Sequence, residues 1–142
     1  MDTATQCLIV TTLPHLIAAA QPGLPSLYVA IVVTSTALSV AWHASPSGAS
    51  HAGAFTSTLG RLDHAVAALW FAAVCYYLWP FASPYFAKTL YLNISVTVVS
   101  MVVSFLDEIN ILPYAVGHSA WHLLSAAKAI TVADFIAKAA HP

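Results

Sequence analysis

Between Asp2 and Arg61 the chain contains no aspartate, glutamate, lysine or arginine. The whole chain is 60% hydrophobic and only 6% charged, whereas about a quarter of the residues in an ordinary soluble domain are charged. A water-soluble fold of this size has too little interior to bury so much apolar surface. We therefore expect the chain to pack against lipid and against its own helices.

Five apolar segments, separated by short polar or Pro/Gly-rich breaks, indicate an all-α protein with a single integral membrane domain over residues 1–142. This predicts a polytopic bundle of about five transmembrane helices, at residues 5–21, 24–44, 62–81, 86–106 and 111–133. The first is the weakest, because it is short and carries Pro14 and His15 in its middle. The other four are long enough to cross roughly 30 Å of hydrocarbon at about 1.5 Å per residue.

Polar side chains with helical spacing interrupt two of these segments. His118 and His122 are four residues apart, so on a helix both imidazoles project from one face. Ser39 and His43 have the same spacing, and Asp63 opens the next segment. Three imidazoles with an exchangeable water make the open zinc site of hydrolases. Zinc also suits nitrogen ligands better than magnesium or calcium does.

The order of the helices predicts that these residues meet on one side of the membrane. The second and fourth helices end on that side, and the third and fifth begin there. His43 lies at the end of the second helix, Asp63 at the start of the third, and the pair of histidines early in the fifth. We therefore predict that His43, His118 and His122 bind zinc. Asp63 would hold and deprotonate a bound water, or ligate the ion through it. Ser39 would hydrogen-bond a ligand or steady a developing oxyanion.

These motifs resemble the signature of the CREST superfamily of seven-helix membrane hydrolases and receptors. The run His118-Ser-Ala-Trp121-His122-Leu is most similar to the alkaline ceramidase, Per and myomaker-like branches, where a Trp precedes the second His. The resemblance implies a zinc ion held by three histidines and, in several members, hydrolysis of lipid amides or esters. This chain would be a shortened five-helix form, with a Ser/Gly/Ala-rich stretch between His43 and Asp63.

Three functions follow from this pattern as hypotheses. The first is a ceramidase-like, zinc-dependent lipid hydrolase that cleaves an amide or ester bond of a membrane lipid entering between the helices. The second is a non-catalytic, metal-stabilised membrane protein acting in sensing or membrane remodelling. The third is a haem-binding electron carrier with two axial histidines, which would leave Ser39, Asp63 and one histidine unexplained. A net charge of −1 with scattered basic residues argues against nucleic-acid binding.

The remaining polar residues of the helices have simpler interpretations. We expect His15 to bond to a neighbouring carbonyl or to face water. His64 should point about 100° away from the residue before it, in an interfacial role. Lys128 is expected to snorkel to the membrane surface, and Asp134 should pair with Lys138 at helix spacing.

The basic residues predict the orientation in the membrane. Lys88, Lys128 and Lys138 belong to the side opposite the predicted metal, where Arg61 is the only basic residue. By the positive-inside rule the carboxyl end faces the cytosol, in an endomembrane or the plasma membrane.

The alanines at 18–20 follow an apolar run without a basic amino end, so we expect the first helix to be retained rather than cleaved as a signal peptide. Small residues in the last helix would allow a homo-oligomer.

Overall fold

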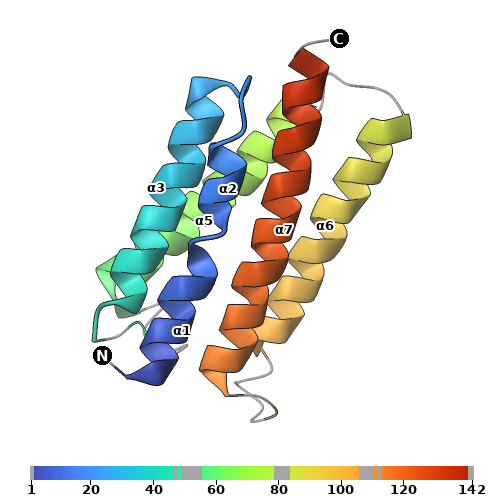
Figure 1. Cartoon of the computed structure of the whole chain (residues 1–142). Coiled ribbons are helices and arrows are strands. Elements are labelled where there is room, and N and C mark those ends of the chain that lie inside the picture. The colour runs from blue at the N-terminus through green and yellow to red at the C-terminus, as the bar shows by residue number, and fades with distance from the viewer. Residues whose placement is uncertain are drawn as a thin grey trace.

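The computed structural model describes residues 2–46, 48, 56–78, 84–105, 111 and 113–140, and within these ranges the chain is helical with no strand. The prediction of an all-α protein is confirmed. The helices run lengthwise beside one another as a bundle (Figure 1). They are α1 (Thr3–Thr12), α2 (His15–Ala19), α3 (Ser26–His43), α5 (Thr58–Leu78), α6 (Pro84–Phe105) and α7 (Tyr114–Ala140).

Pro14 divides the first predicted helix into α1 and α2. Proline has no backbone N–H and its ring clashes with the preceding turn, so a helix breaks at such a position. The N–H of Leu16 donates to the carbonyl of Leu13 at 3.0 Å, and the carbonyl of Thr12 accepts from Nδ1 of His15 at 2.7 Å. The prediction that His15 bonds to a neighbouring carbonyl is confirmed.

The bundle consists of two helix pairs with the broken first helix between them. α3 packs on α5, α6 packs on α7, and α1 with α2 lies against both α3 and α7. The backbone of α5 comes close to α6 and α7 at few points, so α5 meets α7 mainly through the side chains of the apolar core. The apolar core lies toward the amino end of α3 and the carboxyl ends of α5 and α7. It comprises Ala18, Tyr28, Val32, Trp70, Val74, Leu78, Ala129, Val132, Ala133 and Ile136.

The observed helix bounds differ from the predicted ones at both ends of the bundle. α5 begins at Thr58, earlier than predicted, because the hydroxyl of Ser57 accepts from the N–H of Gly60 at 3.0 Å and caps the helix. α7 continues to Ala140, and the predicted pair of Asp134 and Lys138 is confirmed at 2.7 Å. The ends predicted at residues 81 and 106, and residues 49–55 of the Ser/Gly/Ala-rich stretch, lie outside the described residues.

One helix in the described part of the chain, Ser26–His43, combines the length and the apolar composition needed to cross a bilayer. The segment Thr3–Ala19 is apolar but shorter. The multi-pass arrangement with about five spans therefore stays a prediction.

Candidate metal centre

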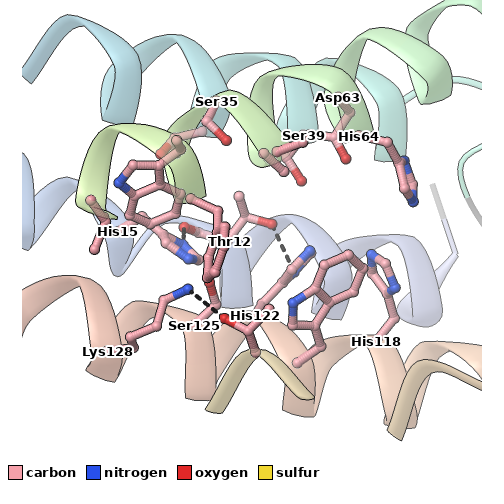
Figure 2. Close-up of a pocket in the computed structure, with 18 residues that line it drawn as sticks. Thr12, His15, Ser35, Ser39, Asp63, His64, His118, His122, Ser125 and Lys128 are labelled. Atoms are coloured by element: carbon pink, nitrogen blue, oxygen red, sulfur yellow. Dashed lines mark hydrogen bonds between the residues drawn. The ribbon is translucent and has the colours of Figure 1, made fainter. Parts of the chain in front are cut away.

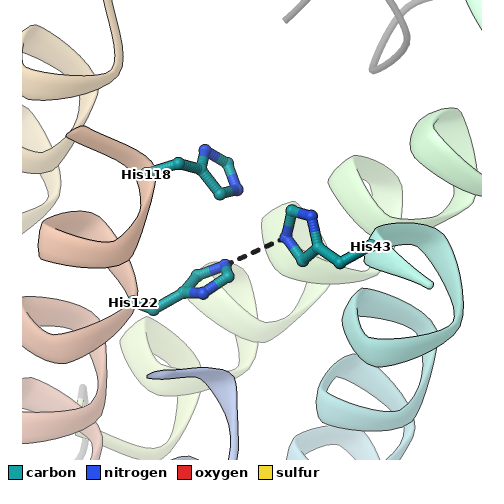
Figure 3. Close-up of side chains that lie close together, drawn as sticks. All are labelled: His43, His118 and His122. Atoms are coloured by element: carbon teal, nitrogen blue, oxygen red, sulfur yellow. Dashed lines mark hydrogen bonds between the residues drawn. The ribbon is translucent and has the colours of Figure 1, made fainter. Parts of the chain in front are cut away.

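Three buried histidines from α3 and α7 meet at one end of the bundle (Figure 3). His43 is the last residue of α3, whereas His118 and His122 lie early in α7. α3 ends and α7 begins at the same end of the bundle (Figure 1), as the order of the helices predicts. One ligand atom from each ring lies within 4.8 Å of the others. These three residues could therefore hold a metal ion.

His43 is oriented by the turn that follows α3. Its Nδ1 lies 2.8 Å from the carbonyl oxygen of Gly48, and a carbonyl only accepts, so Nδ1 carries the proton. Gly48 reaches this position because it has no side chain: a Cβ there would lie 2.0 Å from the carbonyl oxygen of Trp42. The turn thus leaves the Nε2 lone pair of His43 free to bind a metal.

His122 is oriented in the same way by α1. Its Nδ1 lies 2.9 Å from the hydroxyl of Thr12 and 3.2 Å from the carbonyl oxygen of Leu8. The Thr12 hydroxyl donates its own proton to Leu8 at 2.9 Å, so both oxygens accept from the ring. His122 therefore also carries its proton on Nδ1 and presents the Nε2 lone pair inward.

The two inward nitrogens, Nε2 of His43 and Nε2 of His122, are 3.4 Å apart. Two lone pairs at this distance repel each other unless a cation lies between them. Two ligands on one tetrahedral zinc, each about 2.0–2.1 Å from the ion, are about 3.3 Å apart. A proton shared between the two Nε2 atoms would involve only His43 and His122. A metal ion would also use the third imidazole, His118. The geometry therefore fits a metal ion.

His118 is held in place by aromatic rings. Its ring stacks on Tyr114 at 4.8 Å between centroids and meets the edges of Trp121 at 4.6 Å and Trp42 at 5.6 Å. The centroids of His118 lie 5.0 Å from His43 and 4.7 Å from His122. This apolar packing excludes water from one side of the histidine cluster.

A cavity of about 520 Å³ opens between the two helix pairs, and His118 and His122 lie in its wall. Asp63 of α5 and Ser39 of α3 lie side by side on the opposite wall (Figure 2). Both residues are buried. The structure thus brings all five residues singled out in the sequence to one end of the bundle, four of them in the lining of one cavity.

Three further polar residues line this cavity although the sequence analysis set them aside: His15, His64 and Lys128. His64 does not point away as expected. Its Nδ1 donates to the carbonyl of Gly60 at 2.8 Å, and its ring packs on Trp42 and Trp121. α5 has room to turn both Asp63 and His64 into the cavity because its backbone comes close to α6 and α7 at few points.

The prediction that Lys128 snorkels to the surface is wrong. Its side chain is 9% exposed, its Nζ donates to the Thr97 hydroxyl at 3.3 Å, and it lies 5.5 Å above the ring of Trp70. The predicted helix ended at residue 133, near Lys128, but α7 continues to Ala140. Twelve residues of α7 follow Lys128 and extend about 18 Å beyond it, so the ammonium group does not lie at the end of the bundle.

Comparison of the chain with family models, with curated proteins and with solved structures gave no match. The resemblance to the CREST superfamily therefore rests on the sequence motifs alone.

Proposed function

We propose that the chain is a zinc-dependent hydrolase that cleaves an amide or ester bond of a membrane lipid, as a shortened five-helix relative of the CREST superfamily. The observation that carries the proposal is the facing pair of Nε2 atoms of His43 and His122 at 3.4 Å. A third imidazole stands beside this pair, and a cavity opens next to it.

Zinc is the metal that these ligands favour. All three are neutral nitrogens, which suit zinc better than the hard ions magnesium and calcium. Three protein ligands leave the fourth tetrahedral position open, as catalytic zinc sites require. The hydrogen bonds from Nδ1 to Gly48 and to Thr12 match the outer-shell contacts that orient zinc-bound histidines.

A lipid environment is supported by the outer surface of the bundle. Each helix exposes large apolar side chains, and at least one from each is more than half exposed, for example Val10, Ile17, Leu27, Leu69, Val98 and Val116. Exposed large apolar side chains on every helix are what a surface in contact with lipid would carry. Lys88 lies near the start of α6, and Asp134 and Lys138 lie near the end of α7. We propose that the helices cross the membrane several times, with these charges at its faces.

The residues around the cavity suit hydrolysis of a carbonyl compound. A bound zinc ion supplies a Lewis acid that polarises a carbonyl and acidifies water. Asp63 is the only carboxylate that the described residues contribute to the cavity wall, and it acts as the base that takes the proton from the attacking water. Ser39, which lies beside Asp63 in the cavity wall, donates its hydroxyl proton to the oxyanion that forms on the substrate. The apolar cavity wall, with Ala67, Phe71 and Val74, accommodates the lipid chain.

The test uses the zinc-loaded full chain in lipid nanodiscs and a panel of ceramides, phospholipids and N-acyl amines. We expect release of fatty acid from at least one class. Asp63→Asn should lower the rate by about 10²–10⁴-fold with zinc content unchanged, and Ser39→Ala by about 10²-fold. Ser35→Ala is the matched control, since Ser35 lies one turn away on α3 in the same cavity wall. A chain that retains zinc but cleaves none of the panel would instead be non-catalytic.

A further inference from the structure

Lys128 is a buried ammonium group without an anionic partner in the described part of the chain. Its only hydrogen-bond acceptor there is the Thr97 hydroxyl at 3.3 Å, and the Thr97 hydroxyl itself donates to the carbonyl of Asn93 at 2.7 Å. The face of Trp70 at 5.5 Å adds a cation–π contact. No carboxylate among the described residues lies within ion-pair distance of Lys128. Burying a charge in this way is unfavourable unless a partner compensates it.

The ammonium group lines the same cavity as the histidines and lies at a different depth (Figure 2). Lys128 follows His122 by six residues on α7, which corresponds to about 9 Å along the helix axis. Asp63, the carboxylate of this cavity, lies near the start of α5, at the histidine end of the bundle. The cavity therefore has a metal-binding end and a cationic end joined by an apolar middle, and its volume of about 520 Å³ suits a ligand of ordinary small-molecule size.

We propose that Lys128 binds a carboxylate of the substrate, so that the substrate is an acyl amide or ester whose carboxylate is separated from the scissile carbonyl by a chain long enough to span the roughly 9 Å between His122 and Lys128 along α7. This inference rests on the proposed zinc hydrolase and names its substrate class. The single positive charge of the ammonium group balances the single negative charge of a carboxylate. A phosphate monoester would leave an additional negative charge in an apolar cavity, which makes it the weaker candidate.

The experiment measures binding rather than turnover. The probe is suberic acid monohydroxamate, which chelates zinc through its hydroxamate and carries a carboxylate at the far end of its chain. The control without the terminal charge is its methyl ester. The control for length is succinic acid monohydroxamate, which is too short to reach Lys128. Affinities are measured on the zinc-loaded full chain in detergent micelles, with Lys128→Met, Lys128→Arg and the exposed control Lys88→Met.

We expect the suberate probe to bind about tenfold to a hundredfold more tightly than its methyl ester. Lys128→Met should abolish this preference, Lys128→Arg should keep most of it, and Lys88→Met should leave it unchanged. The succinate probe should bind the wild-type chain and Lys128→Met with the same affinity, because its carboxylate does not reach Lys128. Equal binding of the suberate probe and its ester to the wild-type chain would overturn the carboxylate site and leave the zinc centre intact. Binding of neither probe would refute the zinc centre and this inference together.

Discussion

Nε2 of His43 and Nε2 of His122 face each other at 3.4 Å, although 79 residues separate them in the chain. Their Nδ1 atoms donate outward, to Gly48 and to Thr12 with Leu8. Each ring therefore turns a lone pair toward the other, an arrangement that is stable only around a cation. The predictions on the metal follow from this relationship.

Zinc content should depend on the three histidines and on no other histidine of the cavity. We expect one zinc ion per chain in purified protein by elemental analysis, and loss of the ion in His118→Ala, because two remaining imidazoles bind zinc weakly. His15→Ala is the control, since His15 is buried near His122 but bonds to the carbonyl of Thr12. A Soret band in place of zinc would favour the haem carrier.

The hydroxyl of Thr12 should strengthen zinc binding through His122. Thr12→Val removes the nearest acceptor of Nδ1, at 2.9 Å, and leaves the Leu8 carbonyl at 3.2 Å and the Thr11 hydroxyl at 3.3 Å, so we expect a loss of metal affinity of about tenfold, at the low end for an outer-shell contact. Competition with a zinc-binding dye measures the change. Thr36→Val is the matched control: its hydroxyl is also buried and donates to a carbonyl four residues earlier, without an imidazole partner. Equal effects of both substitutions would contradict the role assigned to Thr12.

Gly48→Ala should weaken the metal centre from outside the cavity. A Cβ at this position would lie 2.0 Å from the Trp42 carbonyl oxygen and 2.5 Å from Cα of His43, so the turn must move and its carbonyl must leave the His43 ring. We expect a loss of zinc affinity of about 10–100-fold by the same dye competition. Ser45→Ala, in the same turn, adds no bulk and should bind zinc almost normally. Unchanged affinity in Gly48→Ala would show that the carbonyl does not orient His43.

Zinc should stabilise the folded chain by mass action, because the unfolded chain does not hold three imidazoles together. At a free zinc concentration about 100 times the Kd, the free energy of unfolding should rise by about 2.7 kcal/mol, which corresponds to a rise in Tm of several degrees. Thermal unfolding in detergent, with and without a chelator, measures the shift. The same rise in Tm in His118→Ala would place the stabilising ion elsewhere.

Cysteine labelling should show which surfaces face lipid. In a background with Cys7→Ser and Cys75→Ser, Lys138→Cys should react with a membrane-impermeant maleimide from one side of the membrane, since Lys138 lies near the end of α7. Val98→Cys, exposed in the middle of α6, should not react until detergent is added. Rapid labelling of Val98→Cys in intact vesicles would contradict the multi-pass arrangement.

Local sequence patterns were sufficient for the helices and for the pairing of His118 with His122, because both depend on helical periodicity. The order of the helices also predicts that His43 and the α7 histidines lie at the same end, which the structure bears out. The sequence indicated that Pro14 weakens the first helix, but it did not predict which side chains the break would bring together. By ending α1 at Thr12, it places a hydroxyl against a ring 110 residues away.

Local sequence patterns could not predict how deeply the polar side chains lie within the bundle. The inward turn of His64 depends on the gap between α5 and the α6–α7 pair, and the burial of Lys128 depends on the length of α7. Local spacing and composition are enough to predict an all-helical fold and the three histidines that could hold a metal ion. They are not enough to predict which imidazole nitrogen faces inward or which polar groups share the cavity. Those properties arise from contacts between helices far apart in the chain, and no local pattern encodes them.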